Sequence, residues 1–285
     1  MRKRSGFPLI DIVYFHSIVS RFTLQSSLIQ SNTEFYPTTQ KKRGIVIVAH
    51  GLNVKPTAML SLIGWFNTHG CDCFLPRFSG HYENPSDTAG ITVKVWQKEM
   101  INGYEAAKEA AGQHNIPLFF LGYSLGGLLG VDLVLSAGND VAISKQVLLA
   151  PAIAVRNTAS LLKLFFWWNS LYLPSFTPAK YRANKSLSIN AYKTMFRIVS
   201  NITQAKARLI IPTLAVVDTM DELISTKKLV NFLDKFADGH YELLRLDSEM
   251  KNRQGGYHHL IINKETMGEA NWKLFTEKMK AFLFN

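Results

Sequence analysis

The chain has 285 residues, of which 47% are hydrophobic and 19% are charged, with 18 glycines and 10 prolines. This composition excludes collagen-like, coiled-coil and intrinsically disordered proteins, and the length favours one domain with an insertion. The 32 Lys and Arg residues outnumber the 21 Asp and Glu residues, giving a net charge of +11. Such an excess favours contact with an anionic membrane, a charged substrate or nucleic acid.

The N-terminal region combines positive charge with an apolar stretch. Arg2, Lys3 and Arg4 precede the stretch 7–20, which resembles a secretory signal but is interrupted by polar residues and lacks a clean cleavage site. No stretch has the roughly 18 uninterrupted apolar residues that a spanning helix needs. We therefore expect a cytoplasmic or membrane-peripheral protein, with secretion as the weaker alternative, and a basic extension with the first strands in residues 1–43.

From residue 44 onward, strand patterns alternate with helix patterns. Strands are expected at 45–49, 71–78, 118–122, 146–150, 209–217 and 241–246, and helices near 62–67, 93–111, 125–136, 227–236 and 264–284. This alternation predicts an α/β protein with a mostly parallel sheet and helices on both faces. Because it is interrupted once, we divide the chain into a core of 44–153 and 206–285 and an insertion of 154–205.

The insertion differs in composition from the core. Residues 151–210 include nine Lys or Arg and no Asp or Glu, and nine aromatic residues lie between Phe165 and Phe196. Blocks such as Phe165–Trp168 are too apolar for a solvated helix, so we expect them to wall a hydrophobic pocket or to meet lipid near anionic headgroups. Because contiguous apolar blocks of this kind usually become buried, we expect no nucleic-acid binding.

A serine stands in a tight glycine turn between a strand and a helix. The residues Gly122-Tyr123-Ser124-Leu125-Gly126 form a G-x-S-x-G pattern between the expected strand 118–122 and the expected helix 125–136. In that context the turn projects the serine hydroxyl above the end of the strand, and the helix N-terminus favours negative charge beside it. Ser124 is therefore the candidate nucleophile.

A serine nucleophile needs a base, and the base needs an acid that orients it. Both are expected where later strands end, because the carboxyl ends of parallel strands share one edge of the sheet. Asp218 and Asp221 follow the strand 209–217, and His258 and His259 follow the strand 241–246. The residues alone leave two candidates for the acid and two for the base.

These motifs resemble the α/β-hydrolase family, in particular its carboxylesterase, monoacylglycerol lipase and lysophospholipase branch. Outside the insertion, the resemblance extends from about residue 44 to the C-terminus. Its motifs are His50-Gly51, the loop 76–81, the turn 122–126, the stretch 212–221 and the stretch 258–261. The resemblance implies an α/β-hydrolase fold with a helical lid at 154–205.

The resemblance also selects among the candidates. The family has its acid nine residues after the proline that opens the strand, and from Pro212 this position is Asp221 rather than Asp218. It commonly has an acidic or amide residue five positions after its histidine, and Asn263 takes that place if the histidine is His258 rather than His259.

Further roles are implied by the same resemblance. The backbone N–H groups of Leu52 and Leu125 are expected to stabilise the oxyanion, and His50 and His81 are expected to shape loops rather than to transfer protons. No cofactor and no metal ion are expected, because adjacent histidines without a carboxylate cluster do not make a metal site.

The predicted function is hydrolysis of carboxylic esters with apolar acyl groups by Ser124, His258 and Asp221, as in a carboxylesterase or a monoacylglycerol or lysophospholipid lipase. The expected partners are a small-molecule ester or lipid substrate and, peripherally, an anionic membrane. One alternative is a thioesterase or peptidase that uses the same three residues. Another is a catalytically idle scaffold that binds a membrane or a partner protein.

Overall fold

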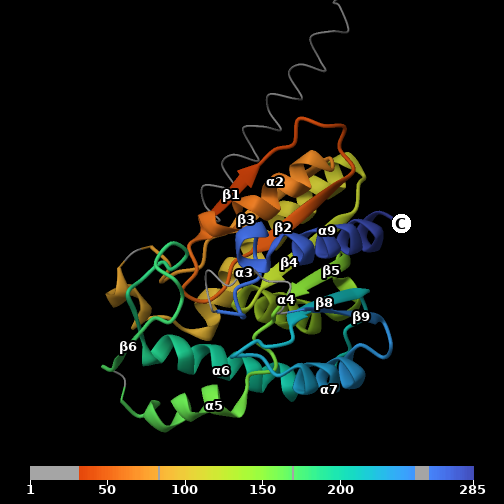
Figure 1. Cartoon of the computed structure of the whole chain (residues 1–285). Coiled ribbons are helices and arrows are strands. Elements are labelled where there is room, and N and C mark those ends of the chain that lie inside the picture. The colour runs from red at the N-terminus through yellow and green to blue at the C-terminus, as the bar shows by residue number, and fades with distance from the viewer. Residues whose placement is uncertain (1–31, 83, 169, 248–256) are drawn as a thin grey trace, which may run out of the picture.

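The computed structural model describes residues 32–285 except 83, 169 and 248–256. The centre of this part of the chain is a seven-stranded sheet in the order β1-β3-β2-β4-β5-β8-β9 (Figure 1). The strands are β1 (Thr33–Tyr36), β2 (Gly44–Ala49), β3 (Cys71–Pro76), β4 (Leu118–Tyr123), β5 (Ile143–Leu149), β8 (Thr213–Asp218) and β9 (Tyr241–Leu246). β1 is antiparallel to β3 and all other neighbours are parallel, so the predicted mostly parallel sheet is confirmed.

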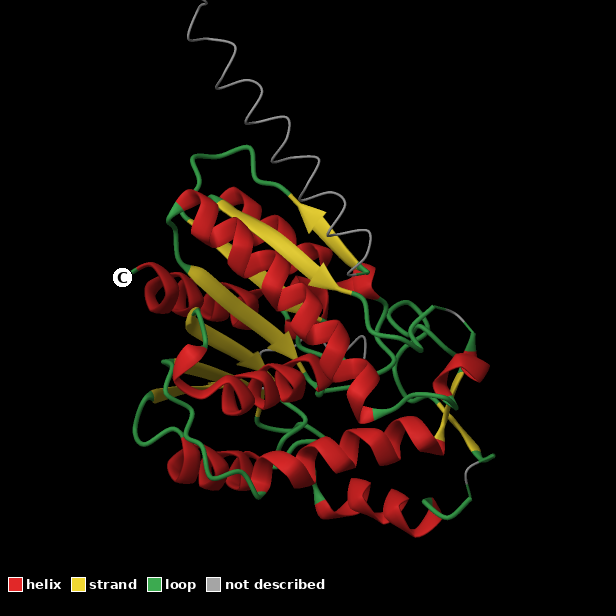
Figure 2. Cartoon of the chain, turned by 180° about the vertical axis from the view of Figure 1, so that it is seen from behind, coloured by secondary structure: helices red, strands yellow, loops and turns green. Residues whose placement is uncertain are grey.

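Helices connect the strands and close the chain. The α-helices of the core are α2 (Leu60–Thr68), α3 (Val93–His114), α4 (Leu125–Ala137), α7 (Thr226–Phe236), α8 (Lys264–Met267) and α9 (Glu269–Phe284). Short 3-10 helices are η1 (Pro56–Met59), η2 (Pro85–Thr88) and η3 (Gly138–Asp140). As Figures 1 and 2 show, helices cover both faces of the sheet.

Strand β4 illustrates how both faces become buried. Successive side chains of a strand point to opposite faces. Phe119 meets Phe284 of α9 with ring centroids 5.8 Å apart, whereas Phe120 lies beneath α4, where a Cβ added to Gly130 would approach its ring to 2.2 Å. A strand covered on both sides has no polar face, which is why β2 and β4 read in the sequence as continuous apolar runs.

Several element boundaries differ from the prediction, and two of the differences have a clear physical cause. The strand expected from residue 209 begins at Thr213, because Pro212 has no N–H to donate to the ladder. The closing helix is divided into α8 and α9 at Gly268, whose φ of 82° is the left-handed region that favours glycine.

Between β5 and β8 the insertion forms its own small layer. It contains α5 (Asn157–Ser160), η4 (Leu161–Phe165), the antiparallel pair β6 (Tyr172–Pro174) and β7 (Ser186–Ser188), and α6 (Ile189–Thr203). Helix α6 packs on α4 of the core, and α5 lies on the outer side of α6 (Figures 1 and 2). The insertion thus packs against the side of the core that carries α4.

The signal-like stretch 7–20 lies outside the described residues. None of the helices that are described has both the length and the apolar character needed to cross a membrane.

Candidate active site

Ser124 occupies the sharp turn between β4 and α4. Its φ of 50° and ψ of −109° form a conformation that a residue with a side chain rarely adopts. Neighbouring backbone holds it there: its N–H donates to the carbonyl of Leu149 at 2.9 Å, and its carbonyl accepts from the N–H of Ala152 at 3.0 Å. The strained turn is therefore fixed by the end of β5.

The glycines of the turn have a steric cause. A Cβ at Gly122 would lie 2.6 Å from the backbone N of Gly127, and a Cβ at Gly126 would lie 2.3 Å from the carbonyl oxygen of Ala49. Both distances are too short for a side chain, so the G-x-S-x-G pattern is required for α4 to start this close to β2 and β4.

His259 lies between Ser124 and Asp221. The Ser124 hydroxyl donates to Nε2 of His259 at 2.9 Å, and Nδ1 of His259 donates to Oδ2 of Asp221 at 2.9 Å. All three residues are buried, although they come from the β4–α4 turn, the β8–α7 loop and the segment before α8. The predicted residues Ser124 and Asp221 are thus brought together by a histidine.

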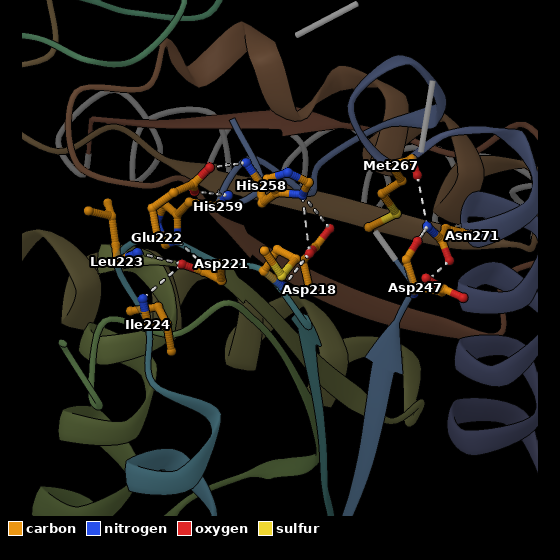
Figure 3. Close-up of polar contacts among 11 residues, drawn as sticks. Asp218, Asp221, Glu222, Leu223, Ile224, Asp247, His258, His259, Met267 and Asn271 are labelled. Atoms are coloured by element: carbon orange, nitrogen blue, oxygen red, sulfur yellow. Dashed lines mark hydrogen bonds and ion pairs between the residues drawn. The ribbon is translucent and has the colours of Figure 1, made fainter. Parts of the chain in front are cut away.

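That histidine is not His258, which the family spacing favoured. Nδ1 of His258 lies 3.3 Å from Oδ1 of Asp218, and Figure 3 shows the two histidines facing different carboxylates. The spacing pointed to Asn263, but the side chain of this residue caps α8, accepting from the N–H of Thr266 at 2.9 Å. The structure therefore brings His259, one residue after the position that the family spacing indicated, into contact with Ser124 and Asp221.

The carboxylate of Asp221 is held by two further donors. Its Oδ1 accepts from the N–H groups of Leu223 at 2.8 Å and Ile224 at 2.7 Å. Burial alone would raise the pKa of Asp221, but the charge and hydrogen bond of His259 and the two backbone donors together hold this pKa below its ordinary value. An ionised Asp221 keeps the proton of the neutral imidazole on Nδ1, which leaves Nε2 free to accept from Ser124.

The two leucines expected at the oxyanion hole flank Ser124. Leu125 is the first residue of α4, so its N–H has no acceptor within the helix. Leu52 lines the cavity beside Ser124, and a Cβ at the preceding Gly51 would lie 3.2 Å from the Cβ of Ser124. Within the described residues, neither N–H donates to another group.

The loop that carries Leu52 is tied to the insertion by Asn53, which the motifs did not single out. The amide of Asn53 donates to Ser175 Oγ at 2.7 Å and to the carbonyl of Asn184 at 2.9 Å, and its Oδ1 accepts from the N–H of Asn184 at 2.8 Å. Its φ of 57° is one that asparagine tolerates better than most residues. An Asn directly after the His-Gly-Leu stretch was the only sequence signal for this contact.

His50 and His81 are buried side chains that lie in loops. Nδ1 of His50 donates to the carbonyl of Gly51 at 3.0 Å, and its Nε2 accepts from the N–H of Phe78 at 3.2 Å. Burial lowers the pKa of His50 well below its ordinary value, and burial lowers the pKa of His81 to about 4. Both rings are therefore neutral near pH 7, which fits the loop-shaping roles expected for them.

A cavity of about 280 Å³ opens beside Ser124. Its lining combines residues of the core with residues of the insertion: Leu52, Asn53, Val54, Tyr123, Ser124, Ala152, Val155, Thr158, Ala159, Leu162, Leu173, Ser175, Phe176, Thr177, Leu187, Tyr192, Met195, Phe196, Leu223, Ile224, Tyr257 and His259. This lining, taken over the described residues, contains no Asp, Glu, Lys or Arg. Such a cavity suits an uncharged, apolar group.

Metal-ligating residues do not gather in the part of the chain that the structure describes: no group of three or more His, Cys, Asp or Glu there is arranged to hold a metal ion.

Comparison with known families gives one match along the sequence. The model of a family described as serine aminopeptidase, S33, matches residues 40–191, which is more than half of the chain. No curated protein matches the sequence.

Several solved structures share the fold at low sequence identity. A soluble variant of monoglyceride lipase from Saccharomyces cerevisiae, in complex with a substrate analog, superposes with a TM-score of 0.73 at 15% identity, covering 88% of this chain and 89% of that one. A structure described with the metagenome-derived lipolytic enzymes LipS and LipT gives 0.71 at 20% identity, covering 88% and 96%. The monoacylglycerol lipase of Paleococcus ferrophilus gives 0.64 at 17% identity, covering 88% and 98%.

Proposed function

The chain belongs to the serine aminopeptidase S33 family of α/β-hydrolases, and from that premise we propose that it is a serine hydrolase acting on carboxylic esters with apolar acyl groups. In this proposal Ser124 is the nucleophile, His259 the base and Asp221 the acid that orients the base. The observation that carries it is the pair of 2.9 Å contacts that His259 makes, one to the Ser124 hydroxyl and one to the Asp221 carboxylate.

The proposed reaction proceeds through an acyl-enzyme. Ser124 Oγ bonds to the carbonyl carbon of the ester while its proton passes to His259, and the developing oxyanion is stabilised by the N–H groups of Leu52 and Leu125. His259 then gives this proton to the departing alcohol as the ester C–O bond breaks. A water molecule, deprotonated by His259, attacks the acyl-enzyme and releases the acid, after which the proton returns to Ser124.

The lining of the cavity favours an ester over a peptide with a free amino terminus. An aminopeptidase must hold a positively charged α-amino group, which calls for a carboxylate near the scissile bond. Asp221 is occupied by His259 and two backbone donors, and the described cavity lining supplies no other carboxylate. Thioesters remain the alternative for which the same three residues and the same apolar cavity are suited.

We also propose that residues 154–205 act as a lid on the core of 44–153 and 206–285, with 1–43 as an N-terminal extension. Support comes from the cavity, to which the insertion contributes residues of α5, η4, β6, β7 and α6. The acyl group of the substrate would lie against these elements, so the insertion would determine which esters are accepted.

Peripheral contact with an anionic membrane is the second part of the proposal, and the outer face of the lid supports it. The described residues expose twelve large hydrophobic side chains, and seven of these lie between 161 and 176. We refer to these seven exposed side chains as the apolar ridge: Leu161, Leu164, Phe165, Trp167, Trp168, Tyr172 and Phe176. Phe176 is 84% exposed and also lines the cavity beside Ser124, so the ridge adjoins the route to the nucleophile.

The charge of the segment that contains the apolar ridge indicates the kind of surface it would meet. No Asp or Glu occurs from 151 to 210, whereas nine Lys or Arg do. Each basic residue near an anionic bilayer contributes about 1 kcal/mol of attraction, and tryptophans favour the interface itself. A bilayer that contains phosphatidylserine therefore suits this face better than a neutral one.

Hydrolysis of a series of p-nitrophenyl esters tests the first part of the proposal. We expect turnover that rises from acetate to medium-chain esters and is absent in Ser124→Ala, whose circular dichroism and melting temperature stay close to those of the wild type. A Ser124→Ala protein with wild-type esterase rates would show that another residue performs the reaction. An unreactive wild type would favour the idle scaffold instead.

Co-sedimentation with lipid vesicles tests the second part. We expect binding to phosphatidylcholine vesicles that contain phosphatidylserine, and weaker binding of the variant Trp167→Ser/Trp168→Ser. Leu274→Ser removes an exposed hydrophobic side chain from α9 and is the matched control, with binding equal to that of the wild type. Equal binding by all three proteins, or concentration-dependent dimers that need the two tryptophans, would contradict membrane docking by the apolar ridge.

A further inference from the structure

Glu222, the neighbour of Asp221, contacts the main chain of both histidines. Its Oε1 accepts from the N–H of His258 at 2.7 Å, and its Oε2 accepts from the N–H of His259 at 2.9 Å (Figure 3). Each carboxylate oxygen thus receives its own backbone donor, and hydrogen bonds to an ionised acceptor are about twice as strong as those between neutral groups. One side chain thereby holds two consecutive peptide units.

The β8–α7 loop supplies three carboxylates to this short segment, and each has a different target. Asp218 faces the ring of His258, with 3.3 Å between its Oδ1 and Nδ1. Asp221 holds the ring of His259, and Glu222 holds the backbone of both histidines. The loop that bears the proposed acid therefore also holds the backbone from which the side chain of the proposed base extends.

The carbonyl group of His259 is held by a residue of β4. The Tyr123 hydroxyl donates to the carbonyl of His259 at 3.2 Å, and Tyr123 directly precedes Ser124. Together with Glu222, this contact leaves neither backbone polar group of His259 without a partner. The ring contacts to Ser124 and Asp221 can persist only if this main chain stays in place.

The negative charge of Glu222 also affects the pKa values of two neighbouring tyrosines. Burial raises the pKa of Tyr257, and the negative charges of Glu222 and Asp221 raise it further. The same two charges add to the effect of burial and of Tyr257 on the pKa of Tyr123. A carboxylate with this influence favours positive charge on a neighbouring imidazole.

We propose that Glu222 is a positioning residue for the base: it fixes the main chain of His259 so that Nε2 stays within reach of Ser124 Oγ, and its charge favours the imidazolium that forms when His259 accepts the proton. This inference rests on the proposed function, because it assigns Glu222 a role toward the proposed base. A displacement of about 1 Å at a reacting group can cost about 100-fold in rate, so a residue outside the cavity lining can have a large effect on turnover.

Two variants of Glu222 separate its geometry from its charge. Glu222→Ala removes both acceptors, and we expect kcat to fall by about 10- to 100-fold with KM changed by less than about 2-fold. Glu222→Gln keeps the shape but offers one oxygen acceptor for two N–H donors, and we expect a kcat between those of Glu222→Ala and the wild type. Glu242→Gln is the matched control, because Glu242 is an exposed carboxylate in an ion pair with Lys278 on β9 and α9.

The pH profile adds a readout that loss of structure alone would not move. The charged and titratable groups that face the His259 segment are Asp218, Asp221, Glu222, Tyr123, Tyr257 and His258. Removing the negative charge of Glu222 makes the imidazolium less favourable, so the base stays unprotonated to lower pH. We expect the acid limb of kcat/KM to move to lower pH in Glu222→Gln and to stay in place in Glu242→Gln.

The rate at which a fluorophosphonate labels Ser124 distinguishes failure of this inference from failure of the proposed function. We expect slower labelling in both Glu222 variants and a wild-type rate in Glu242→Gln. Wild-type protein that is labelled, together with Glu222 variants that have wild-type labelling rates, kcat and acid limb, overturns the role of Glu222 alone. Wild-type protein that is not labelled overturns the proposed function and this role with it. If Glu222→Ala melts at a lower temperature than the wild type, the labelling rate, kcat and acid limb of the isosteric Glu222→Gln decide whether Glu222 positions His259.

Discussion

The loops at the strand ends and the insertion of 154–205 solve different physical problems. In the loops, the carboxylates of Asp218 and Asp221 are buried, and Asp221 is held by three donors. In the insertion, large apolar side chains are exposed: Trp167 is 77% exposed and stacks on Trp168, with ring centroids 5.3 Å apart. The loops fix a geometry, whereas the insertion presents a surface.

Under the proposed function, this contrast assigns the reaction to the loops and the choice of substrate to the insertion. Groups that exchange a proton need donor–acceptor distances near 3 Å. Short turns that are strained, or that are held by more than one hydrogen bond, can keep such distances. An acyl chain or a bilayer needs only apolar area, which the exposed and cavity-lining side chains of the insertion supply. Changes to the loop residues that contact Ser124 or His259 should therefore lower turnover most, and changes in the insertion should alter which esters are accepted.

The sharpest test of the loops uses the adjacent histidines. His259→Ala removes the base and should lower kcat/KM by at least about 1,000-fold, because the Ser124 hydroxyl then has no acceptor for its proton. His258→Ala removes only a ring that faces Asp218 and should cost about 10-fold or less. Steady-state kinetics on one ester measures both. The opposite ranking would restore the register that the family spacing favoured.

The two aspartates offer a second comparison. Asp221→Asn leaves His259 without a carboxylate on Nδ1 and favours the wrong tautomer, so kcat should fall by about 1,000-fold or more. Asp218→Asn changes a group that contacts His258 and the N–H of Met220, and about 10-fold is the largest loss expected. Single-turnover measurements would separate these losses from slower product release, and equal losses would contradict the assignment of the acid.

The insertion should respond differently. Leu162 is half-buried in η4 and lines the cavity, so Leu162→Trp should shorten the space for the acyl chain. We expect the ratio of kcat/KM for a long ester to that for acetate to fall by about 10-fold, with the acetate rate nearly unchanged. An equal fall for both esters would mean that this position supports the reacting groups rather than substrate choice.

The smallest effect concerns stability and pH. The pKa of Asp221 lies below its ordinary value of 3.8 in the folded protein, so its ionised form stabilises the fold above that pH, and this contribution is lost as pH falls through the lower, folded value. The difference in unfolding free energy between wild type and Asp221→Asn should therefore shrink as urea denaturation is repeated from pH 6 toward pH 3. A difference that grows toward acid would contradict the sign.

Much of the fold could be predicted because its signals are local. Continuous apolar runs such as 45–49 identify strands buried on both faces, and the glycines around Ser124 identify a turn in which a Cβ has no room. The family's spacing from Pro212 indicated Asp221, because these two residues lie on either side of the same strand.

The remaining site residues depend on contacts between distant segments. His258 and His259 are equivalent in composition, and only the carboxylates that face them decide which ring reaches Ser124. Glu222 acts through main-chain N–H groups, which no side-chain pattern reveals. The contacts of Asn53 could not be predicted either, because its partners Ser175 and Asn184 lie more than 120 residues away in the sequence.

The central claim is that Ser124 is a nucleophile activated by His259, and labelling with a fluorophosphonate tests it most directly. Intact mass spectrometry followed by peptide mapping should find a single adduct on Ser124 of the wild type. It should find none in Ser124→Ala and a strongly slowed reaction in His259→Ala. An unlabelled wild type, or an adduct that persists in Ser124→Ala, would contradict the account.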